Sequence, residues 1–137
     1  MSNSNPRAST DVVRRLYAAI EAGRSGEELR SHFADDARTV THPNALVPAG
    51  RTDDLAAMLA ASAQGAGLLR RQAYDLRSVV EVDDLVVTRL HWTGEVAVDP
   101  GPLTAGQRLT AEIAQFVRVT DGRVAEIETY DCYRPLS

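Results

Sequence analysis

Arg89 and His91 form the first group of residues in this sequence that could take part in proton transfer. Arg89 and His91 alternate along a strand-like stretch, so they share one face of it, while the apolar residues beside them take the other. A fixed cation next to a titratable imidazole suits acid–base chemistry. A structural salt bridge is the alternative, because Glu112 is expected on a neighbouring strand.

A carboxylate and a second histidine are further candidates. Asp131 shares a strand face with Thr129 and Ile127, so it lies beside apolar walls if Ile127 points into the core. Such surroundings raise the pKa of a carboxyl group and make it a competent acid or base; a solvated strand end is the alternative. His42 directly precedes Pro43 and could act as a general base or simply bond the adjacent loop.

The composition excludes several kinds of chemistry. All 15 basic residues are arginine, so the chain has no lysine for a Schiff base or a phosphate-binding loop. The three histidines lack metal-ligand spacing, and the single cysteine, Cys132, has no base partner. A net charge of −4 with scattered arginines argues against nucleic acid or an anionic membrane. We therefore expect no metal and no cofactor.

The length and pattern of the chain indicate one domain. Its 137 residues are enough for one core, which we place at 9–137 after a disordered tail at 1–8. No apolar run resembles a signal peptide or a membrane span, so a cytoplasmic protein is expected. Residues 86–92 carry apolar side chains on both faces of a strand, which predicts a homodimer through the outer face of the sheet.

Four long strands should form the centre of the fold. Apolar and polar residues alternate from Leu109 to Tyr133 on both sides of Asp121-Gly122, the pattern of a tight hairpin. Two further stretches, Leu68 to Val82 and Leu85 to Val98, are separated by an acidic turn. The sheet must be covered on one face, and the N-terminal third is left to cover it.

The N-terminal third reads as three helices. The first should start after Ser9 or Thr10 and stop at Gly23, and the second follows a capping box that begins at Ser25. A short extended piece, Ala37 to Thr41, and a loop at 44–50 come next. Thr52 should cap the third helix, which closes at Gly65 or Gly67, and 99–102 should be a loop.

Several segments resemble a known family. They include Leu-Tyr-Ala-Ala-Ile-Glu-Ala-Gly at 16–23, His-Phe-Ala-Asp-Asp-Ala at 32–37 and Val-Thr-Asp-Gly-Arg-Val at 119–124. In order and spacing they are similar to the SnoaL-like, polyketide cyclase-like branch of the nuclear transport factor 2-like superfamily. The resemblance implies a cone-shaped α+β barrel: three N-terminal helices packed on a strongly curved antiparallel sheet of four long strands plus a short one. The concave side would hold an apolar pocket.

The resemblance also suggests roles for individual residues. His42 stands where ketosteroid isomerases carry a catalytic aspartate, and Gln115 stands where they carry a protonated aspartate that donates to the enolate. A neutral amide can donate the same hydrogen bond with less charge stabilisation; pairing across the sheet is the alternative. The tyrosine that completes this donor pair is replaced by Leu16, with Tyr17 one step round the helix.

We therefore predict a small-molecule enzyme that transfers protons on an apolar carbonyl compound in the cone pocket, as cyclases, isomerases or dehydratases do. A non-catalytic binding protein and an epoxide hydrolase-like enzyme are the alternatives. The catalytic candidates are Asp131, His42, His91 and Gln115, and the substrate-binding candidates are Arg89, Tyr17, Trp92 and Thr129. For Tyr17 and Trp92, packing in the core or in a dimer is the competing interpretation.

Overall fold

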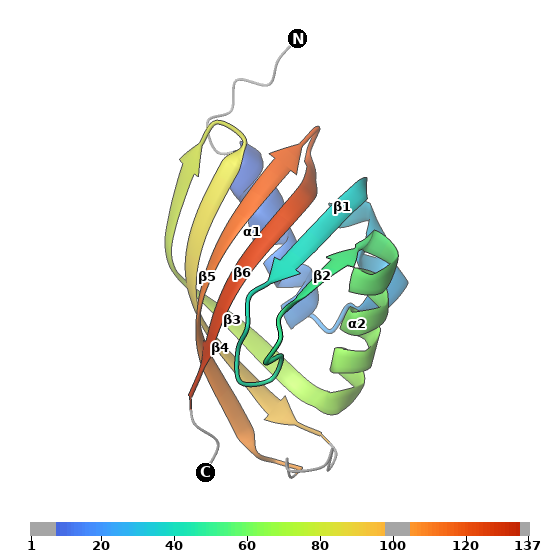
Figure 1. Ribbon diagram of the computed structural model, residues 1–137, viewed down its shortest axis with the longest axis vertical. Coiled ribbons are helices and arrows are strands. Elements are labelled where there is room, and N and C mark those ends of the chain that lie inside the picture. Colours follow the sequence, from blue (N-terminus) through green and yellow to red (C-terminus); the bar gives the residue numbers. More distant parts are fainter. Residues whose placement is uncertain (1–7, 98–104, 135–137) are drawn as a thin grey trace.

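A curved sheet bends around a long helix to form the body of the molecule (Figure 1). The structure is a computed structural model that describes residues 8–97 and 105–134. Its elements in chain order are α1 (Ala8–Glu21), the 3₁₀ helix η1 (Gly26–His32), β1 (Phe33–Thr41), β2 (Arg51–Asp54), α2 (Leu55–Leu68), β3 (Leu69–Val82), β4 (Leu85–Val96), β5 (Arg108–Thr120) and β6 (Arg123–Tyr133).

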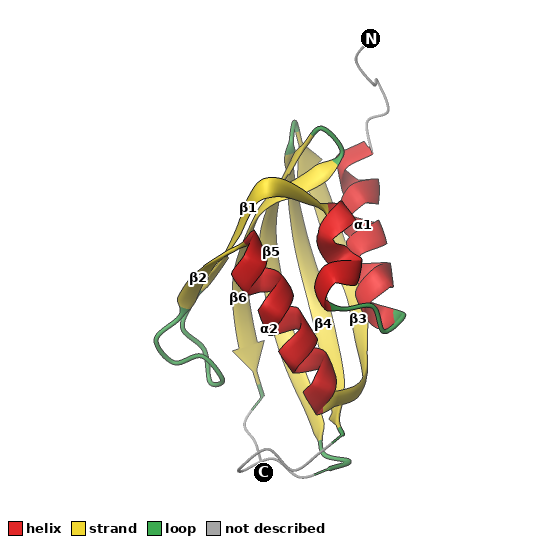
Figure 2. Cartoon of the chain, turned by 90° about the vertical axis from the view of Figure 1, so that its right-hand side faces the viewer, coloured by secondary structure: helices red, strands yellow, loops and turns green. Residues whose placement is uncertain are grey.

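The expected architecture of three helices on a curved sheet is confirmed. All three helices lie on the same face of the sheet, as Figure 2 shows. The strand order is β2-β1-β6-β5-β4-β3, so the sheet is open, with β2 and β3 at its edges. The sheet differs from the expectation in two ways: β1 pairs with β6 in parallel, which makes it mixed, and β2 is an additional strand.

The two predicted acidic turns join the long strands. Asp121 and Gly122 both have positive φ, 52° and 76°, the conformation that two-residue hairpin turns require. Asp83 also has positive φ, 56°, between β3 and β4. These turns fix the register of the meander, and so they decide which side chains face the helices.

The helix boundaries differ from the prediction at the third helix. Thr52 does not cap it, because Arg51–Asp54 forms β2. Asp54 is the cap, and its side chain accepts a hydrogen bond from the amide of Ala57 at 2.9 Å. Gly65 and Gly67 do not end α2, which continues to Leu68. The second helix follows Ser25 as predicted, but it has 3₁₀ geometry.

The core lies between α1 and the concave face of the sheet. Val13 and Leu16 of α1 are buried in one cluster with Val86, Leu90 and Val117 of the central strands. Among the described residues, no helix is long and apolar enough to cross a membrane. The predicted tail, apart from Ala8, and the predicted loop at 99–102 lie outside the described residues.

Candidate functional site

The helices and the concave face of the sheet enclose a pocket of about 410 Å³. Its two sides differ in chemistry. The helices contribute mainly apolar side chains, among them Leu16, Ile20, Leu29, Met58 and Leu59. The sheet contributes Phe33 and Ile127 and a polar set: Thr39, Thr41, Arg51, Asp53, Tyr74, Gln115, Thr129 and Asp131. A ligand with an apolar body and oxygen functions along one edge would match both sides.

A chain of hydrogen bonds crosses the floor of this pocket. The Tyr17 hydroxyl donates to Gln115 Oε1 at 2.7 Å, and Gln115 Nε2 donates to Thr129 Oγ1 at 3.2 Å. Thr129 Oγ1 in turn donates to Asp131 Oδ1 at 2.6 Å. Since Tyr17 has one hydroxyl proton, Thr88 must donate in the 2.9 Å contact between their hydroxyl oxygens. Every bond therefore runs in one direction and ends on the Asp131 carboxylate.

Burial raises the pKa of two groups in this chain of hydrogen bonds, the Tyr17 hydroxyl and the Asp131 carboxyl group. It raises the pKa of the Tyr17 hydroxyl to about 12, so that group keeps its proton at neutral pH and acts as a donor. Burial also raises the pKa of Asp131, while the hydrogen bond from Thr129 lowers it in part. The carboxylate is therefore a stronger base than an exposed aspartate, which is the property a proton-transfer site needs.

Gln115 keeps one donor for a ligand. Its amide carries two hydrogens, and one of them goes to Thr129. The Tyr17 hydroxyl holds the amide oxygen, which fixes the amide with its nitrogen toward Thr129. The second amide hydrogen makes no hydrogen bond within the described residues, and Gln115 lines the pocket. Sequence reasoning placed Leu16 at the tyrosine position and did not anticipate that Tyr17 would contact Gln115.

His42 lies on the opposite face of the sheet from the pocket. Its neighbour Thr41 lines the pocket, and successive residues of an extended chain point to opposite sides. His42 Nε2 bonds Glu128 Oε2 at 2.7 Å, and its ring stacks on Tyr130 with centroids 4.1 Å apart. This bond is the main cause that lowers the pKa of Glu128. The structure does not bring His42 to Asp131 and Gln115.

The Arg89 and His91 pair also lies on the outer face. His91 Nδ1 bonds Glu112 Oε2 at 2.5 Å, which confirms the expected proximity of these two residues. Arg89 is exposed, and neither Arg89 nor His91 lines the pocket. Trp92 points inward but belongs to the core, where its Nε1 donates to Gln72 Oε1 at 2.9 Å.

The sequence analysis did not predict the pocket residues on the two short strands, β1 and β2. Thr39 and Thr41 of β1 and Arg51 and Asp53 of β2 all line the pocket. Alternation along Arg51-x-Asp53 was the available signal, but the segment was assigned to the cap of the third helix. Tyr74 also lines the pocket, and its ring stacks on Tyr17 at 5.2 Å.

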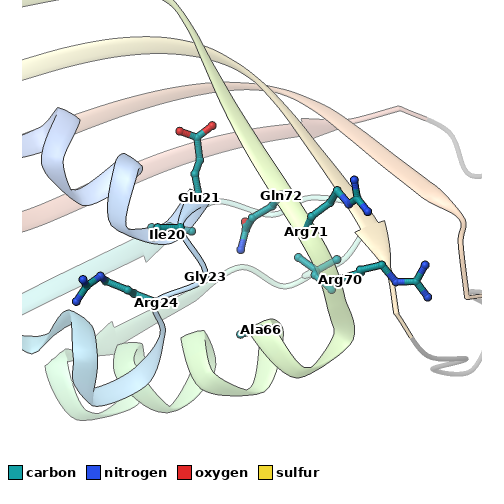
Figure 3. A pocket seen from close by; sticks show the side chains of 10 residues that line it. Ile20, Glu21, Gly23, Arg24, Ala66, Arg70, Arg71 and Gln72 are labelled. Atoms are coloured by element: carbon teal, nitrogen blue, oxygen red, sulfur yellow. The ribbon is translucent and has the colours of Figure 1, made fainter.

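A second depression of about 370 Å³ lies beside the first, and Ile20 borders both. Figure 3 shows its arginines, Arg24, Arg70 and Arg71. The Arg24 and Arg70 side chains extend in opposite directions, so their charges do not converge on one ligand position. Within the described part of the chain, no group of three or more histidine, cysteine or acidic residues could hold a metal ion.

The chain shares its α+β fold with a solved structure described as having a ketosteroid isomerase-like fold and with one described as nuclear transport factor 2-like. The chain belongs to the SnoaL-like domain family, whose model matches residues 13–127. No curated protein matches it.

Solved structures support this placement. The chain is similar to IdmH, a proposed polyketide cyclase from Streptomyces antibioticus, with 25% identity, coverage of 90% of this chain and 91% of that chain, and a TM-score of 0.74. AclR, a proposed hydroxylase from Streptomyces galilaeus, shows 17% identity, coverage of 96% and 83%, and a TM-score of 0.77. A proposed SnoaL-like polyketide cyclase from Jannaschia sp. CCS1 shows 20% identity, coverage of 96% of this chain and 90% of that chain, and a TM-score of 0.70. The latter two share the fold alone.

Proposed function

We propose that this protein is an enzyme that transfers a proton next to a carbonyl group of a small, largely apolar compound, without a cofactor. One observation carries the proposal: Asp131 and Gln115 lie in the wall of the same pocket and are joined through Thr129. A base with a raised pKa thus stands beside an amide donor, under an apolar roof. Membership of the SnoaL-like family and the similarity to IdmH are consistent with this chemistry.

The proposed reaction starts with Asp131 as general base. Its carboxylate takes a proton from the carbon next to the carbonyl, and the C–H electron pair becomes the carbon–carbon double bond of an enolate. The carbonyl π pair moves onto oxygen, where the second amide hydrogen of Gln115 stabilises the developing charge. If the substrate has a carbon–carbon double bond at the β,γ position, the enolate is a dienolate, and return of the proton from Asp131 to its γ-carbon completes an isomerisation. In a cyclisation, the enolate carbon attacks a second carbonyl, and the new alkoxide takes the proton instead.

Two residues act through others in this scheme. Tyr17 positions Gln115 by holding its amide oxygen, and Thr129 positions both Gln115 and Asp131. The outer-face residues Arg89 and His91 take no part. The epoxide hydrolase-like alternative rests on the resemblance of Arg89 and His91 to the Arg-x-Asp pair with which limonene-epoxide-type hydrolases hold a water. Because neither residue lines the pocket, this alternative is disfavoured.

Deuterium exchange at the α-carbon of a ketone tests proton transfer without knowledge of the natural substrate. Proton NMR of 2-tetralone and related cyclic ketones in D₂O should show faster loss of the α-proton signal with the wild-type protein than in buffer. Asp131→Asn should lower the enzymatic rate by about 10²- to 10⁴-fold, the usual contribution of a general base. His42→Ala is the matched control, because it removes an imidazole on the opposite face of the sheet, and it should keep the wild-type rate.

Two results would contradict the proposal. If Asp131→Asn exchanged the ketone as fast as wild type, Asp131 would not be the base. If the wild-type protein bound ketones in the pocket but exchanged none of them faster than buffer, the non-catalytic binding protein would take the place of the enzyme.

A further inference from the structure

The mouth of the pocket carries an arginine held by an aspartate. Arg51 and Asp53 lie on alternate positions of β2, and both line the pocket. Asp53 Oδ2 accepts from Arg51 Nε at 2.7 Å, and Asp53 Oδ1 accepts from Nη2 at 3.2 Å. The Asp53 side chain is only 15% exposed, whereas that of Arg51 is 45% exposed. The pair is therefore anchored on the Asp53 side and open on the Arg51 side.

This arrangement leaves one edge of the guanidinium group for a ligand. A guanidinium carries five N–H donors in a plane, and a carboxylate can bind two parallel donors on either of two edges. Asp53 occupies the edge formed by Nε and Nη2. Asp53 is also the only hydrogen-bonding or ion-pair partner of Arg51 among the described residues, and Arg51 is the only cation among the described residues that line the pocket.

We propose that Arg51 binds a carboxylate group of the ligand through the edge formed by Nη1 and Nη2, with Asp53 as the residue that positions it. The ligand is then an apolar carbonyl compound that also carries an acidic group. This inference rests on the proposed function in one respect, because it places the same ligand in the same pocket. It adds a substrate class and a binding residue.

The register of the sheet determines how far apart the two proposed ligand-binding residues, Arg51 and Gln115, lie. Arg51 pairs with Thr41, Thr41 pairs with Thr129, and Thr129 pairs with Gln115, so these four positions form one row across β2, β1, β6 and β5. Neighbouring strands lie about 4.8 Å apart, so Arg51 and Gln115 are separated by about 14 Å along the row. The backbone that carries Asp131 lies about 10 Å from β2 by the same spacing. A carboxylate at Arg51 is thus kept away from the Asp131 carboxylate, while the carbonyl group reaches Gln115.

Paired probes can test the carboxylate site directly. Calorimetric titration should show that 1-naphthaleneacetic acid binds the wild-type protein about tenfold or more tightly than 1-naphthaleneacetamide, because the two differ only in the charged group. Arg51→Gln should abolish this preference by weakening the acid, while the amide keeps its affinity. Arg77→Gln is the matched control: Arg77 Nε also donates to an aspartate at an alternate position of its strand, Asp75, at 2.8 Å, but Arg77 does not line the pocket.

A second measurement does not depend on any variant. In ¹⁵N-labelled wild-type protein, the Nε–H resonance of Arg51 should shift when the acid is added and not when the amide is added. The proposal is overturned if wild type does not bind the acid, if it binds both probes equally, or if Arg51→Gln keeps the preference. None of these results would change the rate of ketone exchange that Asp131 is proposed to catalyse. Conversely, absence of ketone exchange would not change the preference for the acid over the amide. The two proposals can therefore be refuted independently.

Discussion

Burial raises the pKa of Asp131 and the hydrogen bond from Thr129 lowers it in part, so removal of the Thr129 hydroxyl should make the carboxyl group hold its proton more tightly. The 2.6 Å bond from Thr129 Oγ1 stabilises the charged form of Asp131 and opposes the effect of burial on its pKa. A hydrogen bond to a charged group contributes about 1.5–3 kcal/mol. Because Asp131 is only partly buried, water replaces some of this bond, and we expect the lower end of the range for Thr129→Val. That energy raises the proton affinity of Asp131 about tenfold.

NMR titration of ¹³C-labelled aspartate carboxyl groups measures this change without a substrate. Asp131→Asn identifies the resonance by its disappearance, and the titration midpoint of that resonance in Thr129→Val should lie at higher pH than in wild type. Thr39→Val is the control, because Thr39 lines the same pocket but makes no hydrogen bond to Asp131, whose described side-chain bond comes from Thr129. A midpoint that is unchanged or lower in Thr129→Val would refute the hydrogen-bond chain.

The same group links stability to pH with a defined sign. Burial raises the pKa of Asp131 in the folded state above its ordinary value, so between these two values the folded chain holds more protons than the unfolded chain. Stability contributed by this group is therefore present at acid pH and is lost as the pH rises through the raised pKa. Asp131→Asn removes the loss, so urea denaturation should show that this variant is as stable as wild type or more stable at neutral pH, although it should exchange ketones more slowly.

Three further predictions concern the scaffold and the assembly. Glu81→Ala should lower the free energy of unfolding by about 2 kcal/mol in urea, because the carboxylate accepts from Thr10 N at 2.8 Å and Thr10 Oγ1 at 2.6 Å in the first turn of α1; a loss no larger than that of an exposed-site control would contradict this. Gly94→Ala should cost about 1–3 kcal/mol and shift the tryptophan fluorescence, since its new methyl group would lie 2.6 Å from the Trp92 ring; unchanged fluorescence would count against the contact. Light scattering should show a dimer through the outer face, where Phe116 is 39% exposed, and a monomer of 14.8 kDa would rule the dimer out.

The long strands could be predicted from the sequence because their signals, a tight turn and the alternation of apolar residues, arise within short stretches of the chain. The Asp121-Gly122 turn needs only two residues that tolerate positive φ, and alternation of apolar residues then assigns faces on both sides of it. The same reasoning placed Thr129 and Asp131 on one face with Ile127, and all three line the pocket. What the sequence could not supply was the pairing of the short strands, which depends on contacts between distant segments.

His42 illustrates that limit. Its face depends on how β1 pairs with β6, and this pairing contains an irregularity: Phe33 lies opposite Val124, whereas Arg38 lies opposite Glu126. Five steps along β1 therefore match two along β6, and no local pattern in the sequence encodes that count.

The register of β1 against β6 decides whether Thr41 or His42 faces the pocket, because successive side chains of a strand point to opposite faces. A slip of one residue in this pairing would turn every side chain of β1 to the other face, and His42 would enter the pocket in place of Thr41. The observed register instead aligns Thr41 with Thr129 and Arg51 and so completes a polar row of uncharged hydroxyls between the arginine at the mouth and Gln115. A protonated histidine in that row would stand next to Asp131, and its charge would favour the ionised carboxylate and lower the pKa that burial raises. The irregularity in β1 thereby keeps the His42 side chain away from the one carboxylate whose basicity the proposed reaction requires.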